Sequence, residues 1–491
     1  MNTKNINNEL SASGGKKHAS CFTVFNNRGQ IVVPIIVFSA LSTILIGGLV
    51  QWAALHIKAT RQLSVRGEAV VVAEAGAEYY RWHLAHAPQD FQDGTGGPGP
   101  YTHSYYDKNG VQIGTFSLTI TPPPIGSTLV TVLSEGVMLA NPLIKRKIRV
   151  QFAVPSWAKY AFAADDFMRF GPGTEVFGEI YSNKGIRFDG LAHNLLSSAV
   201  STFDDPDHPG GNEFGVHTHV SPIDPLPPAT VPNRADIFLA GRKFPVPQLD
   251  FAGLTADLSA LKTKAQAGGR YFANSGTQGY NIVLKTNDTF DLYRVTSVLG
   301  PPGGCGSTQS KWGTWSILAQ TLLGNYTFPA NGIIFVEDNF WIEGRIDGAR
   351  LNIVSARFPE NVSTNTSITI NKNVTYTRYD GADVLGLIAQ ENINIGLKSN
   401  NALLIDGALV AKTGRIGRYY YGSSCGPEYI RSSITLTGAI TTSKRYGFAY
   451  TDGTGYQTRV IIYDANLLYA PPPDFPLTSD QYSVVSWEEV E

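Results

Sequence analysis

An uncharged apolar segment near the N-terminus is the most pronounced feature of the hydrophobic pattern. Residues 31–55 form a run of 25 residues without a formal charge. A helix of this length is roughly 37 Å long at 1.5 Å per residue, enough to cross a hydrocarbon core of about 30 Å. A cleaved secretory signal is the alternative, but its apolar core spans only about 7–15 residues. The segment therefore predicts a single membrane-spanning helix.

The pattern indicates that this helix continues past the membrane. Leu63, Val70, Ala77 and Leu84 recur every seven residues, and Pro88 marks a helix end. One helix over residues 31–87 is therefore predicted. Its first half is apolar on all sides and its second half is amphipathic. The large β-rich remainder of the chain favours a cytoplasmic N-terminus and an exported C-terminal part.

Alternating apolar positions after residue 100 predict a small sheet. Residues 89–100 are a loop, and Phe116, Leu118 and Ile120 then alternate strictly with polar residues. Two further runs follow, and the last one ends near Val154. Residues 89–156 are therefore expected to form three or four antiparallel strands, with one face packed on the end of the helix.

A degenerate repeat runs through the rest of the chain. The order apolar, any, aliphatic, any, Gly, any, aliphatic occurs at residues 403–409 and again 31 residues later, at 434–440. Other copies begin at Phe340 and Thr174, and a copy without the glycine spans 368–374. Such self-similarity is typical of a solenoid.

Residues 157–491 are accordingly predicted to form a right-handed β-helix, interrupted by an insertion at about 189–330. The insertion is expected to hold one short amphipathic helix, with Leu254, Leu258 and Leu261 on one face. A last strand near residues 482–487 is expected to cap the stack. A jelly roll or sandwich is the alternative. The predicted fold is thus mainly β with a long N-terminal helix.

Composition agrees with a turn-rich β protein. Only 16% of the 491 residues are charged, whereas about 25% is usual. The chain has 50 glycines and 28 prolines but remains 43% hydrophobic, which excludes a helical bundle and a disordered chain. The net charge of −1 gives no sign of a nucleic-acid partner.

The N-terminal features together resemble the type IV pilin superfamily. The leader of residues 1–29 is basic and ends in Arg28-Gly29. The apolar helix follows, and then the AEAGAEYYRWHLAH stretch at 73–86. The chain is most similar to PilX-type minor pilins and pseudopilins, including those with a β-helical C-terminal region. Major pilins carry a glutamate at the fifth position after the cleavage point, where this chain has Pro34.

The resemblance implies processing and assembly. A prepilin peptidase of that family would cut between Gly29 and Gln30, and the freed helix would pack with other pilin-like subunits in the membrane or a filament. It implies four parts: the leader, the helix at 30–88, the sheet at 89–156 and the β-helix at 157–491. The expected function is type IV pilus-like assembly or surface adhesion by a single-pass membrane protein. The expected partners are the lipid bilayer, prepilin peptidase, other pilin-like subunits and a surface polysaccharide or protein ligand.

Common metal-binding, redox and phosphate-binding motifs are absent from the sequence. There is no H-E-x-x-H, C-x-x-C or phosphate-binding glycine loop. Asp165-Asp166 and Asp204-Asp205 are two adjacent acidic pairs before the C-terminus. An enzyme is not expected, and no cofactor is. The alternative is a membrane-tethered carbohydrate-active β-helix enzyme, which would need several carboxylates on one face.

One polar stretch, Phe203–His219, gathers histidines and carboxylates. His217 and His219 are two residues apart, so on a strand they point the same way. Asp204, Asp205, Asp207, His208 and Glu213 are the nearby residues that could complete a metal site. A hydrophilic surface loop is the preferred interpretation, and no metal is assigned. A metal-dependent adhesive module is the alternative.

Cysteine placement offers a candidate disulfide. Cys21 lies in the leader, whereas Cys305 and Cys425 lie in glycine-flanked segments of the exported part. An exported pair is expected to form one bond that fastens the insertion to the solenoid. Two free thiols are the alternative.

Overall fold

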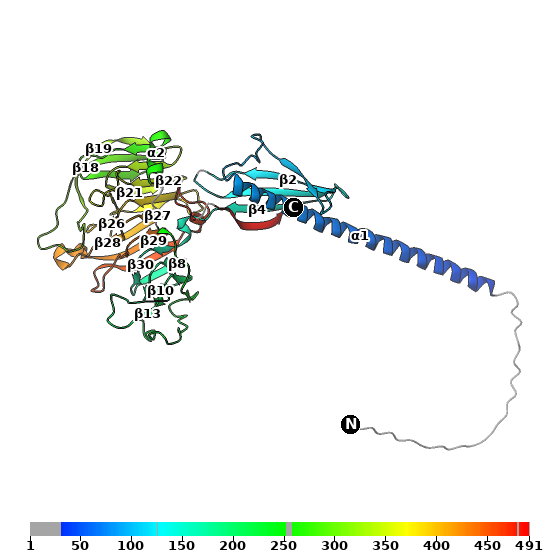
Figure 1. Cartoon of the computed structure of the whole chain (residues 1–491), viewed down its shortest axis with the longest axis horizontal. Coiled ribbons are helices and arrows are strands. Elements are labelled where there is room, and N and C mark those ends of the chain that lie inside the picture. Colours follow the sequence, from blue (N-terminus) through cyan, green and yellow to red (C-terminus); the bar gives the residue numbers. More distant parts are fainter. Residues whose placement is uncertain (1–30, 125, 252–257, 479–480, 491) are drawn as a thin grey trace, which may run out of the picture. The chain divides into compact units, whose positions relative to one another are not determined.

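The fold combines one long helix, a small antiparallel sheet and a larger sheet that is mostly parallel (Figure 1). The computed structural model describes four ranges of the chain, residues 31–124, 126–251, 258–478 and 481–490. The chain divides into two units, residues 1–68 and 69–491. The predicted leader and the predicted cleavage point at Gly29 and Gln30 lie outside the described residues.

The helix α1 spans Val32–His86, which confirms the prediction of one helix over residues 31–87. Pro34 is tolerated because it lies in the first turn, where a backbone N–H has no partner within the helix. The helix ends two residues before Pro88, whose ring restricts the residue that precedes it.

The small sheet contains five strands within the described residues, in the order β1-β2-β3-β4-β31. All its neighbouring strands are antiparallel. The strands are β1 (Tyr101–Tyr106), β2 (Gln112–Thr121), β3 (Val130–Met138), β4 (Lys145–Ala153) and β31 (Ser483–Val490). The antiparallel sheet after the helix is as predicted, but its last strand comes from the C-terminus of the chain.

Small residues bring the second half of α1 close to this sheet. A Cβ atom added to Gly136 on β3 would lie 2.1 Å from the carbonyl oxygen of Ala69 on the helix. A Cβ atom added to Gly76 on the helix would lie 2.4 Å from Ser134 Oγ. Glycine at both positions therefore lets helix and sheet meet at backbone distance. Tyr80, fully buried, donates a hydrogen bond from its hydroxyl to the carbonyl oxygen of Asp90 at 3.0 Å.

Parallel pairing organises the larger sheet into long runs of neighbouring strands. The first run pairs strands in the order β16 (Arg270–Phe272), β20 (Ile333–Val336), β22 (Arg350–Ser355), β25 (Val384–Ala389), β27 (Ala402–Ala411), β29 (Ile430–Thr442), β5 (Phe162–Ala164), β8 (Ile180–Ser182), β11 (Leu196–Ser198) and β15 (Arg242–Lys243). The second pairs β17 (Gly279–Leu284), β21 (Phe340–Ile346), β24 (Val374–Tyr376), β27, β29, β30 (Gly455–Tyr463), β7 (Thr174–Phe177) and β10 (Leu191–Ala192).

Shorter groups complete the β structure. Parallel pairs join β23 (Ile368–Thr369), β26 (Ile393–Ile395) and β28 (Ile416–Arg418). Another parallel group holds β6 (Met168–Phe170), β9 (Ile186–Phe188) and β14 (Val216–His217). Antiparallel pairs join β18 (Thr289–Val298) to β19 (Ile317–Thr327) and to β17, and β12 (Thr202–Phe203) to β13 (Glu213–Phe214). A core of aliphatic and aromatic side chains from these strands is almost wholly buried.

The sequence repeat corresponds to strand register. Leu403 pairs with Ile434 and Gly407 with Gly438, so the two best copies lie side by side residue for residue. Both glycines have a positive φ, 146° and 149°, which residues with a side chain rarely adopt. A Cβ atom on Gly438 would lie 2.0 Å from the carbonyl oxygen of Gly407. The predicted role of the glycine, a close backbone approach, is confirmed at this pair.

Two segments far apart in sequence meet within the larger sheet. Ile440 of β29 pairs with Phe162 of β5, and Arg459 of β30 pairs with Thr174 of β7. The runs also extend into the segment 189–330, because β10, β11, β16 and β17 belong to them. The prediction that this whole segment interrupts the repeat structure is therefore wrong. Local pattern missed these strands because each is only two to six residues long.

Two smaller predictions also need comment. The C-terminal strand β31 does not cap the larger sheet, because it pairs with β4 of the small sheet. The predicted short helix is present as α2 (Leu258–Gly268), with Leu258, Leu261 and Ala265 buried. Leu254, which was expected on the same face, lies outside the described residues.

Candidate functional site

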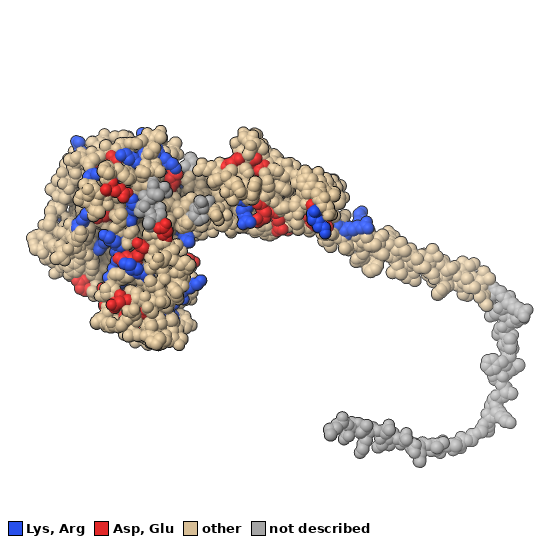
Figure 2. Space-filling view, viewed as in Figure 1, with Lys and Arg blue, Asp and Glu red and all other residues tan. Residues whose placement is uncertain are grey.

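The first half of α1 carries an apolar surface on which none of the described residues of its own unit packs. Large side chains remain exposed along it, among them Phe38 at 74% and Ile44 at 72%. Figure 2 shows this part of the helix without acidic or basic atoms, and the first charged residue after Ile31 is Lys58. The helix is long and apolar enough to be a candidate single membrane span.

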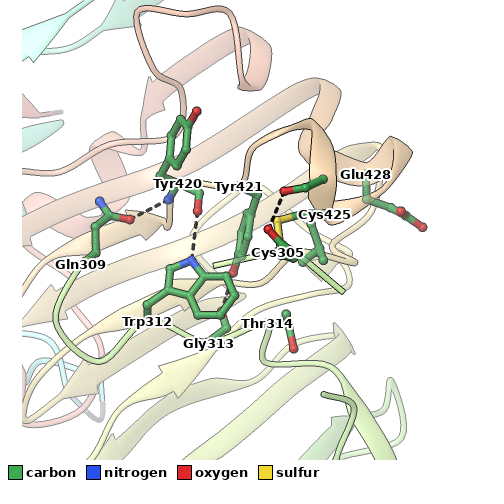
Figure 3. The surroundings of a disulfide bond; sticks show 12 residues. Cys305, Gln309, Trp312, Gly313, Thr314, Tyr420, Tyr421, Cys425 and Glu428 are labelled. Carbon is green, nitrogen blue, oxygen red and sulfur yellow. Dashed lines mark hydrogen bonds between the residues drawn. A yellow bond between two sulfur atoms is a disulfide. The ribbon is translucent and has the colours of Figure 1, made fainter. Parts of the chain in front are cut away.

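A disulfide bond joins Cys305 to Cys425 in the structure (Figure 3). Cys305 lies in the connection from β18 to β19, and Cys425 lies in the connection from β28 to β29. The bond therefore links two long connections that are 120 residues apart in sequence. The predicted pair lies where the two connections meet, and both sulfur-bearing residues are buried.

Polar contacts hold the two connections together around the disulfide. Trp312 donates its indole N–H to the carbonyl oxygen of Tyr420 at 2.9 Å, and Tyr421 donates its hydroxyl to Gly313 at 2.6 Å (Figure 3). The side-chain oxygen of Gln309 accepts the backbone N–H of Tyr420 at 2.7 Å. These hydrogen bonds hold the two connections in position independently of the disulfide bond.

The buried guanidinium of Arg418 lies next to this cluster. It donates to the carbonyl oxygens of Leu397 at 3.0 Å and Glu428 at 2.7 Å. It also lies over the ring of Tyr421, with 4.8 Å between the guanidinium carbon and the ring centroid. Burial lowers the pKa of Arg418 to about 10, so the group is still charged at neutral pH. Backbone carbonyls and an aromatic face stabilise this charge in place of a carboxylate.

Three carboxylates of these acidic pairs have partners within the chain. Asp166 accepts Lys184 Nζ at 2.8 Å, and Asp165 accepts the amide N–H of Asn183 at 2.6 Å. Asp205 lies 3.3 Å from a guanidinium nitrogen of Arg187. Among the described residues, these carboxylates therefore form ion pairs and hydrogen bonds inside the protein.

A hollow of about 410 Å³ lies where β17, β19 and β21 meet. Side chains of both polar and apolar character line it, among them Asn281, Gln320, Trp341 and Glu343. Glu343 lies 2.7 Å from Lys372 Nζ, so its charge is also neutralised within the chain.

The polar stretch predicted as a surface loop is largely folded inward. We call Asp205, His208, Glu213, His217 and His219 the histidine cluster. Glu213 lies on β13, labelled in Figure 1, and His217 lies on β14, which pairs with β9. Asp205 and His208 lie in the turn between β12 and β13. The exposed fractions of Asp205, Glu213 and His217 are 1%, 4% and 1%, so the surface-loop interpretation is wrong for these three residues.

Short distances connect the members of the histidine cluster. His208 Nδ1 lies 2.9 Å from Glu213 Oε1, and His219 Nε2 lies 3.8 Å from the same oxygen. His217 Nε2 lies 3.6 Å from Asp205 Oδ2. The rings of His217 and His219 have centroids 5.1 Å apart, as expected for residues two apart on one side of the chain. Two overlapping triads result, Asp205–His217–His219 and His208–Glu213–His219, each with its ligand atoms within 4.8 Å of one another.

The surroundings of the cluster change its proton affinities. Burial raises the pKa of Asp205, but the His217 ring, the backbone N–H of Asp207 and the Arg187 guanidinium outweigh burial and hold the pKa well below its usual range. Burial lowers the pKa of His219, and the nearby Arg187 and histidine rings lower it further. The cluster therefore favours an ionised Asp205 and a neutral His219.

A second set of buried acids was not singled out from the sequence. Asp406 lies on β27 and Asp464 directly follows β30, with exposed fractions of 3% and 9%. Asp406 Oδ2 accepts the backbone N–H of Tyr376 at 2.9 Å and the hydroxyl of Tyr379 at 2.8 Å. Burial raises the pKa of Asp406 although these hydrogen bonds lower it. The only signal in the sequence is an aspartate directly before the repeat glycine Gly407.

Comparison with known proteins gave little. No family model and no curated protein matches the sequence. Among solved structures, the chain is similar to the competence-associated pilin ComZ from Thermus thermophilus, with 14% sequence identity and a TM-score of 0.29. The match covers 87% of this chain and 97% of that chain.

Proposed function

We propose that this chain is a membrane-anchored, pilin-like surface protein that takes part in type IV pilus-like assembly or in adhesion. One observation carries the proposal. A single helix combines an uncharged exposed half, Val32–Ile57, with a half from Ala69 onwards that packs on an antiparallel sheet. Such a helix suits one segment in the bilayer or in a bundle of similar helices and another segment bound to an exported domain.

We also propose that the larger sheet is a right-handed β-helix that presents an interaction surface outside the membrane. The long runs of parallel pairs support this, because stacked coils place equivalent residues side by side, as Gly407 and Gly438 are. The joined pair Cys305–Cys425 suits an oxidising compartment outside the cytoplasm. A surface polysaccharide or a protein is the proposed ligand, and the hollow beside Asn281 is a candidate contact region.

We propose a non-catalytic role for the exported domain. A glycoside-cleaving site needs two carboxylates on either side of a substrate. Glu343 is the one carboxylate that lines the hollow, and it is paired with Lys372. Assays of the purified protein against polysaccharides should show no cleavage. Turnover that Glu343→Gln abolishes would establish the alternative, a carbohydrate-active enzyme.

Processing of the N-terminus is the first test. In cells with an active prepilin peptidase, protein extracted from membranes should begin at Gln30. The variant Gly29→Ala should keep Met1, whereas the matched variant Gly15→Ala, within the leader, should be cut as usual. An intact Met1 in the unmodified protein would contradict the pilin-like assignment and leave a plain membrane anchor.

Anchorage can be tested separately. A Lys at the centre of a spanning helix costs about 2.5–3.5 kcal/mol, so Ile44→Lys with Leu45→Lys together cost about 5–7 kcal/mol. The double variant should move from the membrane pellet to the soluble fraction after an alkaline wash. Leu143→Lys is the matched control, because Leu143 is 92% exposed and lies outside the helix. Equal membrane retention of both variants would refute anchorage by this segment.

A further inference from the structure

We propose that the histidine cluster binds one divalent transition-metal ion of the zinc type, held by Asp205, His217 and His219. The proposal concerns a site in the exported part and does not depend on pilus-like assembly or on membrane anchorage.

The ring of His217 is the decisive observation. Its Nδ1 atom lies 3.2 Å from the carbonyl oxygen of Phe214, and a carbonyl only accepts, so Nδ1 carries a proton. Its Nε2 atom is buried and has no hydrogen-bond partner. This nitrogen faces Asp205 Oδ2 at 3.6 Å, a distance too long for a hydrogen bond. A buried ring nitrogen without a hydrogen-bond partner is costly, and a cation bound between it and the carboxylate removes that cost.

The buried charged side chains in and around the cluster have a net negative charge. The carboxylates of Asp189, Asp205 and Glu213 are buried, and Arg187 is the buried cation that contacts the first two. These four side chains carry three negative charges and one positive charge. A divalent ion balances the remainder.

The donor atoms and their spacing favour zinc over calcium or magnesium. The cluster offers imidazole nitrogens with few carboxylate oxygens, whereas calcium and magnesium require oxygen ligands almost exclusively. Ligands about 2.0–2.1 Å from a tetrahedral zinc ion lie about 3.3–3.4 Å from one another. The 3.6 Å between His217 and Asp205 is close to this spacing. Glu213 Oε1, 3.8 Å from His219 Nε2, belongs to the neighbouring triad with His208.

Supporting contacts already orient these ligands. His217 directs its other ring nitrogen to a backbone carbonyl, which is the usual outer partner of a metal-binding histidine. The backbone N–H of Asp205 donates to Glu213 Oε2 at 3.1 Å, and the backbone N–H of His219 donates to Asp189 at 2.8 Å. The turn that carries Asp205 and His208 also lines a surface hollow of about 540 Å³, which gives an ion access from solvent.

The test is metal binding by the full-length protein in detergent, without a histidine tag. After incubation with Zn²⁺ and removal of free metal, elemental analysis should find one zinc ion per chain, and Co²⁺ in its place should give the visible absorption bands of a tetrahedral site. The variants Asp205→Asn and His217→Gln should each weaken zinc binding by at least about 100-fold in competition with a chelating dye. His103→Gln with His193→Gln is the matched control, because each of these rings pairs with a single carboxylate elsewhere.

The outcomes separate the alternatives. The double variant His217→Ala with His219→Ala should lose the ion, and circular dichroism together with an intact Cys305–Cys425 bond would show that the variant is folded. If folded wild-type protein takes up no zinc or cobalt at micromolar concentrations, the proposal is refuted. Binding that survives both Asp205→Asn and His217→Gln also refutes it, and the cluster is then a network of protonated histidines and carboxylates.

Discussion

Loss of the Cys305–Cys425 bond should strongly destabilise the part of the chain that contains the larger sheet. The bond closes a loop of 120 residues. In the chain-entropy treatment, a loop of this length restricts the unfolded chain by about 5 kcal/mol at 25 °C, and measured effects of removing such bonds are about 2–5 kcal/mol. A loss of this size is a large part of the stability of an ordinary domain, which is about 5–15 kcal/mol.

Chemical denaturation of the full chain in detergent measures this loss. The emission of Trp312 and Trp315 should report unfolding near the bond, because both side chains pack against the disulfide cluster. Cys305→Ala with Cys425→Ala removes the bond and two buried sulfur atoms, whereas reduction of the wild-type protein removes the bond alone. Both should unfold at lower denaturant concentration than the oxidised protein, and the reduced wild type isolates the effect of the cross-link.

Cys21→Ser is the matched control, since Cys21 lies in the leader and outside the described residues. It should unfold like the wild type. Equal unfolding of oxidised protein, reduced protein and the double alanine variant would refute the reasoning, because the bond would then contribute nothing. Peptide mapping without reductant that finds free thiols at Cys305 and Cys425 would refute it more directly.

Three further predictions concern packing and buried charge. Gly438→Ala should destabilise the protein by about 1–3 kcal/mol in thermal unfolding, because a Cβ atom there meets backbone, whereas Gly300→Ala, with open space around it, should have little effect. Gly136→Val should separate the small sheet from the helix and expose the contact between them to proteolysis. Unchanged protease resistance would contradict the close approach of the two backbones. The raised pKa of Asp406 means that the native state binds a proton more tightly than the unfolded chain, so stability falls as pH rises above the ordinary value of 3.8. Asp406→Asn should therefore gain stability relative to wild type between pH 4 and pH 7, and a difference that does not change with pH would contradict this.

The N-terminal helix could be predicted from the sequence because its signal is local. The chain has twenty-five consecutive uncharged residues, followed by apolar residues at every seventh position. This pattern specifies a helix with an apolar first half and an amphipathic second half, without reference to any other part of the chain. The repeat was also readable, since alternation places Leu403 and Ile405 on one face and the glycine follows at a fixed distance. Gly407 pairs with Gly438, so the local pattern predicted the correct register between these two strands.

The histidine cluster could be found from the sequence but its burial could not. The stretch Phe203–His219 is rich in charged and polar residues, which is the usual composition of a solvated loop. Burial depends on β14 pairing with β9 and on the Arg187 charge that this pairing brings next to Asp205. No spacing within the stretch itself contains that information.

The sequence by itself thus determined the features that depend on neighbouring residues alone: the long helix, the alternating strands and the close-packed glycines. Only the tertiary structure decided which strands become neighbours, as when β31 joins β4 or when Ile440 pairs with Phe162 across more than half the chain. The physical reason is that backbone hydrogen bonds are alike in every strand. Any exposed strand edge accepts any strand of suitable pattern, and the choice is made by the burial of side chains from the whole domain.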